Sequence, residues 1–200
     1  MTEDVRRRRR GDETRTLILD AAEHLLRTGS YRDLSVGRVM AQAGYRRTVF
    51  YRHFTGLPQL VVAVLSRQAA TASASAFAFR DVAAAPIDLD RARDILRPAV
   101  THWTANGPLI AALRDAAIAD GVIGDVVAAT QGRLEAAILG GLTQRQAAGA
   151  LQEADLPAVA RLLASMSQAY LLGALGQRET DPELVLDTLA LGWVAIVNAP

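Results

Sequence analysis

Several absences limit what this chain of 200 residues can do. It has no cysteine, which excludes disulfide bonds, thiol nucleophiles and thiolate metal ligands. No apolar run reaches the roughly 18 residues of a membrane span, and no apolar segment follows the basic N-terminal stretch as it would in a secretory signal. We therefore expect a cytoplasmic protein that has no membrane partner.

The residue patterns of enzymes are also missing. The three histidines, His24, His53 and His102, share no metal-ligand spacing. The sequence contains no nucleophile elbow, phosphate-binding glycine loop or dinucleotide fingerprint. Asp88 and Asp90 stand beside arginines at an expected helix start, which favours a capping role over an acid–base pair. We expect no catalytic residue, no metal site and no cofactor.

Lysine is absent too, so that all 22 basic residues are arginines, and they are unevenly distributed. Residues 1–60 hold 12 Arg and seven acidic residues, a net charge of +5, whereas residues 61–200 carry −4. A positive field over the first 60 residues suits a polyanionic partner such as DNA. The apolar share of 50% is too high for a disordered chain.

Two short helical segments on either side of a single glycine predict a helix-turn-helix between residues 35 and 54. Ser35 is suited to cap the first segment, and Gly44 to make the sharp turn that follows it. We expect the recognition helix over residues 46–54 and a further helix over residues 14–27, ahead of the helix-turn-helix. Contacts to DNA are expected from the outward residues Arg46, Arg47, Thr48, Tyr51 and His53, with Ser35 and Arg38 as supporting phosphate contacts.

These residues resemble the N-terminal signature of the tetracycline-repressor (TetR) family. The resemblance covers about a quarter of the chain and implies an all-helical homodimer with one helix-turn-helix per subunit and a ligand-binding C-terminal domain. It is carried by Ile18, Ala21, Ala22, Gly29, Tyr31, Ser35, Val36, Ala43, Gly44, Arg47, Phe50, Tyr51, His53 and Phe54.

Four positions depart from the family pattern. The family usually has Ser and Thr where this chain has Arg46 and Val49, and Lys then Glu where it has Leu57 and Pro58. In the family that Lys contacts a DNA phosphate. Since this chain has Leu57 in its place, the resemblance does not extend to this phosphate contact. Arg46 either replaces it electrostatically or alters the sequence that is read. Pro58 fits a first helical turn, where its missing N–H has no partner to lose.

The remaining two thirds of the chain predict further helices and no strand, which makes the fold all-α with about nine helices. Asp155 and Asp181 are suited to cap the last two helices. A break is expected at Asn106-Gly107-Pro108. The six helices expected after the helix-turn-helix span residues 57–80, 89–105, 109–119, 122–152, 156–173 and 182–198.

The last two expected helices are apolar on more than one face, so each must be buried on two sides. A homodimer interface made from these two helices of each subunit would cover the second side, as the resemblance also implies. The alternative is a core within a single chain.

A pocket for a small, mainly apolar effector is expected among large side chains of the C-terminal part. The alternative for each of them is ordinary core packing. The segment 166–193 loosely resembles the mycobacterial ethionamide-activation regulators of the TetR family, which implies an elongated apolar ligand. The candidate lining residues are Trp103, Asn106, Met166, Ser167, Gln168, Tyr170 and Trp193.

Five consecutive arginines, Arg6 to Arg10, precede the expected helix-turn-helix. They form either a solvated tail or an arm that follows phosphates or enters the minor groove, and in both cases we expect disorder without DNA. The domains expected are a disordered basic arm over residues 1–12, a DNA-binding domain over 13–56, and a ligand-binding and dimerisation domain over 57–200.

Together these patterns favour a ligand-responsive transcriptional regulator, a repressor that binds a near-palindromic double-stranded operator as a homodimer and is released by its effector. The alternative is a small-molecule carrier of the same fold without specific DNA binding.

Overall fold

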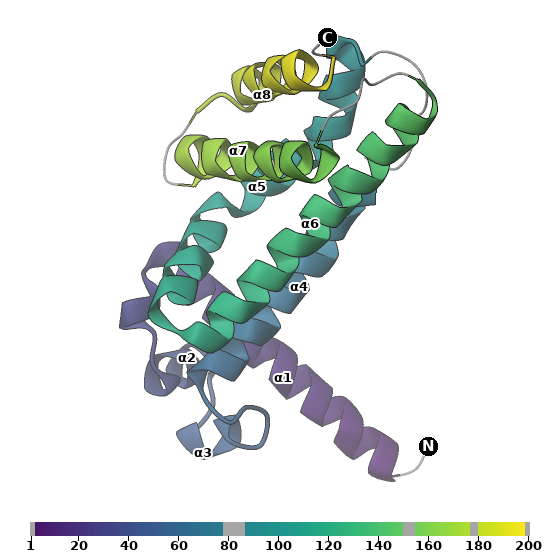
Figure 1. The fold of residues 1–200 in the computed structure, drawn as a ribbon. Helices are drawn as coiled ribbons and strands as arrows, with labels where there is room; N and C mark the ends of the chain where they lie inside the picture. The colour runs from purple at the N-terminus through teal and green to yellow at the C-terminus, as the bar shows by residue number, and fades with distance from the viewer. Residues whose placement is uncertain (1–2, 78–86, 150–154, 177–179, 199–200) are drawn as a thin grey trace. The chain divides into compact units, whose positions relative to one another are not determined.

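The computed structural model describes residues 3–77, 87–149, 155–176 and 180–198, and over these ranges the backbone forms helices and turns without a strand (Figure 1). The expectation of an all-α fold is confirmed. The helices of the described ranges are α1 (Glu3–Thr28), η1 (Tyr31–Asp33, a 3-10 turn), α2 (Val36–Ala43), α3 (Arg47–Phe50), α4 (Leu57–Phe77), α5 (Leu89–Ala119), α6 (Gly121–Ala147), α7 (Leu156–Leu175) and α8 (Pro182–Val197).

The chain divides into two compact units. The first comprises Met1–Arg67 and Ala112–Val126, and the second comprises Gln68–Ala111 and Val127–Pro200. The first unit therefore includes the first half of α4 and the turn between α5 and α6, whereas the sequence predicted a boundary after residue 56. The expected ends of two helices, at residues 80 and 152, lie outside the described residues.

Apolar burial explains why α4 begins within the first unit. Ile18 of α1, Val39 of α2 and Phe50 of α3 are fully buried in its core. Leu60 and Val64 of α4 are fully buried as well. Each such side chain contributes about 1.5–3 kcal/mol when it leaves water, so burial of Leu60 and Val64 stabilises the first turns of α4.

Arg67 adds an ionic contact between α4 and α1. Its guanidinium donates to the Asp20 carboxylate (Nη1–Oδ1 2.7 Å) and also bonds to Glu23. Asp20 and Glu23 stand three residues apart on α1, so they share one face of that helix. Burial lowers the pKa of Arg67, but the hydrogen bonds to Glu23 and Asp20 outweigh it and leave the pKa raised. The last residue of α4 in the first unit is thus tied to α1.

The helix-turn-helix has the local structure that its sequence predicts. The Ser35 hydroxyl accepts from the backbone N–H of Arg38 (3.2 Å) and caps α2. Gly44 ends α2 with φ +77°, the left-handed conformation that favours glycine. The predictions for both positions are confirmed.

The N-terminal end of α1 differs from the prediction, because the helix begins at Glu3 and includes the residues expected to form a disordered arm. The charge pattern gives a physical reason. Glu3 and Asp4 precede Arg7 and Arg8 by four residues, the spacing and order that stabilise a helix, and acidic residues are favourable near its positive N-terminal end.

In the second unit, α5 runs unbroken from Leu89 to Ala119 although it contains Pro98 and Pro108. The break predicted around Pro108 is not found, so two expected helices are one and the described ranges hold eight α-helices. A proline inside a helix costs about 3 kcal/mol. Trp103 and Leu109, on either side of this segment, are both buried, and their burial offsets that cost.

The helices α7 and α8 begin where the sequence predicts. Asp155 accepts from Ala158 N–H (3.1 Å), and Asp181 accepts from Glu183 N–H (3.0 Å), so each caps its helix. Inward side chains of both helices join one apolar core with α5 and α6.

Among the described residues, α7 is the one helix long and apolar enough, by length and composition, to cross a membrane. This is a weak indication, because the core helix of a soluble protein passes the same test. Eight of its side chains are buried in the protein.

Candidate functional site

The recognition segment is shorter than the sequence predicted. α3 comprises the four residues Arg47–Phe50, and a turn follows over residues 51–53. Backbone hydrogen bonds from His53 N–H and Phe54 N–H to the Phe50 carbonyl (2.9 and 3.0 Å) close this turn. The buried rings of Phe50 and Phe54 hold the segment against the first unit, with their centroids 5.5 Å apart.

The residues predicted to contact DNA lie on the outside of this segment. Arg46, Arg47, Thr48 and Tyr51 are exposed, and His53 is half-buried. Tyr51 is 60% exposed, and its ring forms a T-shaped pair with that of Phe50, with 5.4 Å between the centroids. The structure therefore brings two arginines, two hydroxyl groups and an imidazole together beside one short helix.

The two residues expected to support phosphate binding already have partners within the chain. Ser35 caps α2 through its hydroxyl oxygen, which leaves the hydroxyl hydrogen able to donate. Arg38 is exposed and donates from Nη1 to the carbonyl of Asp33 (2.8 Å). Because a guanidinium has five N–H donors, this bond holds Arg38 in place and leaves donors for a second acceptor.

A contact that the sequence analysis missed ties α1 to the end of the recognition segment. The Arg15 guanidinium lies over the ring of Phe54, 5.1 Å from its centroid, in cation–π geometry. The two residues are far apart in the sequence, and no local pattern predicts their pairing.

Tyr31 of η1 lies in the same unit as the turn between α5 and α6. Burial raises the pKa of the Tyr31 hydroxyl, with a further contribution from the negative charge of Asp120. Asp120 also caps α6 by accepting from the backbone N–H of Val122 (3.0 Å). The turn between α5 and α6 thus lies near the supporting part of the DNA-binding unit.

Residues 18–64 match the family model described as bacterial regulatory proteins, tetR family. Residues 18–64 therefore carry the DNA-binding domain of the TetR family. Its members are DNA-binding transcriptional regulators and not enzymes. The resemblance found in the sequence is confirmed, and the matched range contains the helix-turn-helix described above.

Solved structures share the fold over nearly the whole chain. A protein from Rhodococcus sp. assigned to the TetR family is 24% identical with a TM-score of 0.74, covering 94% of this chain and 100% of its own. Salmonella enterica GusR is 17% identical (TM-score 0.73, covering 94% and 96%). A TetR transcription regulator from Haloarcula marismortui is 16% identical (TM-score 0.74, covering 94% and 98%). At these identities the likeness shows the fold alone. No curated protein matches the chain closely enough to be compared.

In the second unit, two of the candidate effector-binding residues bond to each other. The buried indole N–H of Trp193 donates to Ser167 Oγ (2.9 Å), and that hydroxyl donates to the Leu163 carbonyl (2.7 Å). The first bond crosses from α8 to α7, the second lies within α7, and both satisfy polar groups inside the core. They give Ser167 and Trp193 a structural role whether or not an effector binds near them.

The other candidate effector-binding residues lie in or beside the same core. Trp103 is buried, and Met166 and Tyr170 are partly buried against the cluster. Asn106 is half-buried and donates its amide to the His102 carbonyl (3.0 Å). Gln168 is half-buried on α7.

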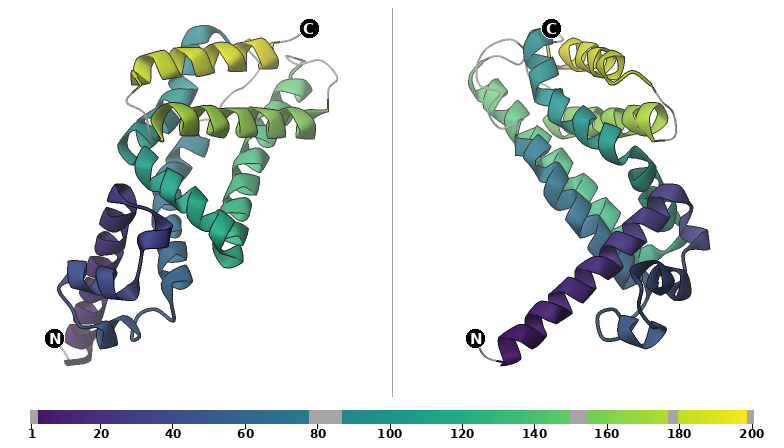
Figure 2. Two further views of the ribbon diagram at one scale, coloured as in Figure 1. Left: turned by 90° about the vertical axis from the view of Figure 1, so that its left-hand side faces the viewer. Right: turned by 180° about the vertical axis from the view of Figure 1, so that it is seen from behind.

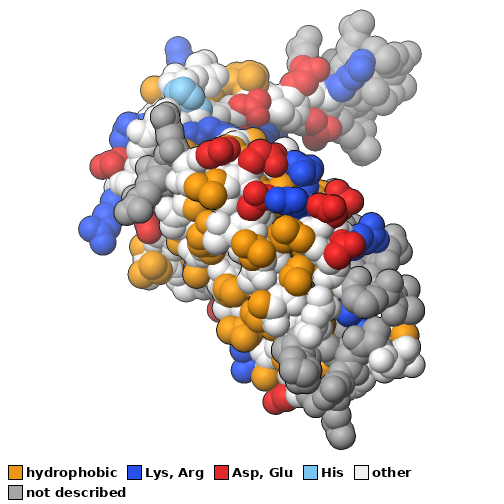
Figure 3. Space-filling view, turned by 90° about the horizontal axis from the view of Figure 1, so that it is seen from above, with side chains coloured by type: hydrophobic (Ala, Val, Ile, Leu, Met, Phe, Trp, Pro, Cys, Tyr) orange, Lys and Arg blue, Asp and Glu red, His pale blue; other side chains and the backbone are white. Residues whose placement is uncertain are grey.

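The outer face of α7 and α8 is apolar. Leu162, Leu184 and Leu191 are 54%, 59% and 58% exposed. Figure 3 looks onto this part of the molecule and shows hydrophobic side chains gathered there, with charged groups along one edge. Gly173 is exposed in the interior of α7, and a Cβ added there would meet nothing within 4 Å. A glycine costs about 1 kcal/mol relative to alanine inside a helix, and the missing side chain at Gly173 leaves room for another backbone to approach.

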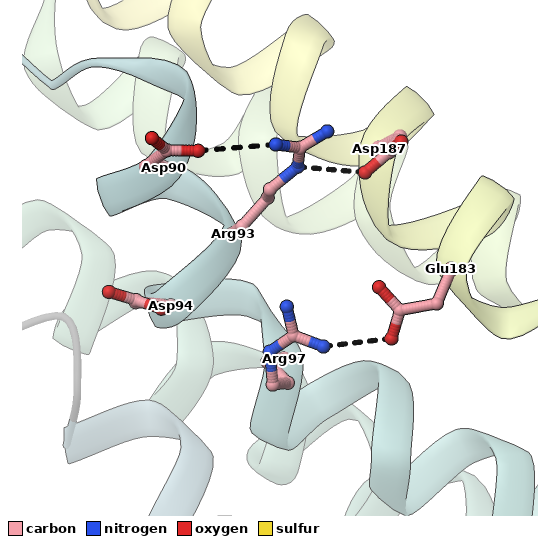
Figure 4. Close-up of a pocket in the computed structure, with 6 residues that line it drawn as sticks. All are labelled: Asp90, Arg93, Asp94, Arg97, Glu183 and Asp187. Atoms are coloured by element: carbon pink, nitrogen blue, oxygen red, sulfur yellow. Dashed lines mark hydrogen bonds and ion pairs between the residues drawn. The ribbon is translucent and has the colours of Figure 1, made fainter.

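A polar hollow of about 430 Å³ lies between α5 and α8 (Figure 4). The sequence did not predict it. Arg93 donates to Asp187 (Nε–Oδ1 2.8 Å), and Arg97 donates to Glu183 (Nη1–Oε1 2.8 Å). The hydrogen bond to Asp187 is the main cause that raises the pKa of Arg93. Arg93 and Arg97 are four residues apart on α5, and Glu183 and Asp187 are four residues apart on α8. This spacing places each pair on one face of its helix, so that the basic face of α5 can meet the acidic face of α8. These ion pairs fix α8 to α5.

Arg145 of α6 is 1% exposed, which is unusual for a charged side chain. Burial lowers the pKa of its guanidinium. It donates to Asn198 Oδ1 (3.4 Å), and Asn198 donates to the Ile87 carbonyl (2.7 Å). These bonds tie the end of α8 to α6 and to the residues just before α5. No group of three or more His, Cys, Asp or Glu side chains suited to a metal ion occurs among the described residues.

Proposed function

We propose that this TetR-family protein is a ligand-responsive repressor that acts in the cytoplasm as a homodimer. The observation that carries the proposal is the recognition segment: Phe50 and Phe54 are buried beneath it, while Arg47, Thr48 and Tyr51 lie exposed on its surface. An arginine can pair with guanine in the major groove, and a tyrosine hydroxyl can bind a phosphate oxygen. These contacts would be carried by Arg46, Arg47, Thr48, Tyr51 and His53, with Ser35 and Arg38 in support.

The homodimer would form through the exposed apolar face of α7 and α8. The face carries Leu162, Leu184 and Leu191, and the exposed Gly173 permits close approach of a partner helix. Two recognition segments held about 34 Å apart would meet successive major grooves of a near-palindromic operator.

A small, mainly apolar effector would bind in the second unit, among the side chains around Trp103, Met166 and Tyr170. To release the operator, it must bind more tightly to a conformation in which the recognition segments no longer match successive grooves. Reciprocity then requires that the operator weaken effector binding by the same factor. In this scheme residues 13–56 bind DNA, and residues 57–200 bind the effector and form the dimer.

The test is selection of bound fragments from the source genome at near-physiological salt, followed by affinity measurement on the enriched sequence. A specific regulator enriches a near-palindromic site, shows a high ratio of specific to nonspecific affinity, and loses affinity steeply as salt rises.

The departures at Arg46, Val49 and Leu57 make a carrier the competing function. A carrier of the same fold would be a folded dimer that binds all sequences weakly and alike. Failure to enrich any site with such a dimer would therefore reject the repressor.

A further inference from the structure

The polar hollow between α5 and α8 has more negative than positive groups. Its lining holds four carboxylates and two guanidinium groups, a net charge of −2. Asp94 in this lining is exposed and forms no ion pair with either arginine (Figure 4). On α7, Arg161 is exposed and forms no ion pair with any carboxylate of the described residues. The second unit therefore carries an acidic hollow and a separate basic group that can meet only between two chains.

Contacts between α7 and α8 show that Arg161 and the hollow lie on opposite edges of their apolar outer face. Met166 of α7 lies against Gly192 of α8, where an added Cβ would come within 3.5 Å of Met166 Cε. A helix turns by about 100° per residue, so Arg161 stands about 140° around α7 from Met166. Glu183, which lines the hollow, stands about half a turn around α8 from Gly192. Each charged group is thus turned away from the other helix of the pair.

The two helices of this face run side by side in opposite directions (Figure 2). The bond between Trp193 and Ser167 sets their register and puts Leu191 of α8 roughly level with Ala169 of α7. Leu191 and Ala169 are both exposed, and they lie near the middle of the outer face.

A two-fold axis through this middle exchanges both the ends and the edges of the face. Arg161 precedes Ala169 by eight residues, and Glu183 precedes Leu191 by eight, about 12 Å in each case. Because the helices are antiparallel, the two distances run in opposite directions. The axis therefore carries Arg161 of the partner subunit over the hollow, and symmetry repeats the contact at the other end of the interface.

We propose that the hollow receives Arg161 of the partner subunit, so that two reciprocal charged contacts fix the register of the homodimer. The inference rests on the proposed homodimer and adds the contacts that select a second copy of this chain over another chain of the same fold. A guanidinium placed beside Asp94 reduces the net charge of the lining from −2 to −1. Charge complementarity of this kind acts mainly on specificity, because a chain with an acidic residue at this position would bring like charges together.

The experiment compares R161E, D94R and the double variant R161E/D94R with the unaltered full-length protein. Both positions are exposed, and circular dichroism checks that helicity is unchanged. The matched control is R133E, which makes the same charge change at an exposed arginine of α6 that bonds to Thr130 of its own helix. Sedimentation without DNA measures dissociation of the dimer at low and high salt.

We expect R161E and D94R each to weaken the dimer about 10–100-fold, because each places like charges together at two symmetric contacts. The double variant restores opposite charges and should return to within about threefold of the unaltered protein, as a coupled pair does. R133E should leave dissociation unchanged. High salt should reduce the losses in the single variants, since it screens exposed charges.

An equimolar mixture of R161E and D94R gives a second readout of the same contact. In the mixed dimer the charge at position 161 faces an opposite charge at position 94 in both contacts, whereas in either homodimer it faces a like charge. Native mass spectrometry should find more than about 90% mixed dimer, against about half for random pairing.

Dimers of R161E and of D94R that are as tight as the unaltered dimer, with random pairing in the mixture, would overturn the proposal, because the hollow would then lie outside the subunit contact. Losses that the double variant does not recover would overturn it as well, since Arg161 and Asp94 would not meet. If the unaltered protein is a monomer, the proposed homodimer itself fails.

Discussion

Side chains more than backbone hydrogen bonds hold the recognition residues in place, because α3 is a single turn long. Phe50 is fully buried, Phe54 is 2% exposed, and Arg15 covers the Phe54 ring. Isolated helices of this length are unstable in water. The orientation of Arg47 and Tyr51 therefore depends on the apolar anchors beneath them and on Arg15, which lies outside the helix-turn-helix.

The exposed residues of the recognition segment should differ in what they read. Tyr51→Phe removes one hydroxyl, and we expect it to weaken binding to the operator and to a scrambled duplex by the same factor, as loss of a phosphate contact does. Arg47→Ala should cost about 1–3 kcal/mol on the operator and much less on the scrambled duplex if Arg47 pairs with a base. Affinities measured for both duplexes separate the two effects. Unchanged affinity in both variants would reject this assignment of the recognition segment.

The bond between Trp193 and Ser167 can be tested by its contribution to stability. Ser167→Ala removes the acceptor 2.9 Å from the buried indole N–H, and we expect a loss of about 1–3 kcal/mol in the free energy of unfolding. Urea unfolding at fixed protein concentration measures it. The double variant S167A/W193F removes both partners, and the coupling energy of the full mutant cycle isolates their bond. A coupling near zero would show that Ser167 and Trp193 contribute only as independent core residues.

At the scale of the helix, α5 passes so close to α7 that only glycine fits at position 107. A Cβ added there would overlap the carbonyl oxygen of Leu175. Gly107→Ala should therefore push the two helices apart and destabilise the protein by about 1–3 kcal/mol or more. Thermal or urea unfolding gives the change.

The matched control is Gly132→Ala in α6, where an added Cβ meets nothing within 4 Å. Alanine is favoured over glycine inside a helix, so this variant should gain about 0.5–1 kcal/mol. Opposite signs for the two substitutions are the expected result. Two gains of similar size would mean that α5 and α7 are not in contact at Gly107.

The local signals in the sequence predicted helix ends well. The residues that end or cap a helix contact backbone groups only a few positions away, so local sequence is enough to predict them. This holds for the caps Ser35, Asp155 and Asp181 and for the helix-ending Gly44. The continuity of α5 through Pro108 was missed, because it depends on burial against other helices and local propensity opposes it. The helical start of α1 is a different case, because the charge of the arginine run indicates a solvated arm, whereas Glu3 and Asp4 stand four residues before Arg7 and Arg8 at a spacing that stabilises a helix.

In the candidate site, too, the sequence predicted what depends on local spacing and did not predict contacts between distant residues. The outward residues of the recognition segment follow from helical spacing, and the structure places Arg46, Arg47, Thr48 and Tyr51 on the surface. Pairings between residues far apart in the sequence do not follow from spacing. Arg15 with Phe54 required the tertiary structure, and so did the ion pairs that line the hollow between α5 and α8.

At the scale of the whole molecule, the exposed apolar face of α7 and α8 is expected to make stability depend on protein concentration. Association that covers this face stabilises the folded state by mass action, so the melting temperature should rise with concentration. The dimer also determines DNA affinity, because a second recognition segment held near the first binds its half-site at high effective concentration.

Leu191→Glu tests both consequences at once. The substitution places a charge on the outer face of α8, and burying it without a partner costs several kcal/mol, so we expect dimerisation to weaken at least about 100-fold. Analytical ultracentrifugation measures the dimer, and operator affinity should fall in parallel. Ile118→Glu is the control, since Ile118 is 87% exposed but lies in the first unit, at the end of α5. If Ile118→Glu dissociates the dimer and Leu191→Glu does not, the partner subunit covers the turn between α5 and α6, and the interface proposed for α7 and α8 is wrong. If both variants remain dimeric and Leu191→Glu still loses the operator, the face of α7 and α8 affects DNA binding by a route other than subunit contact.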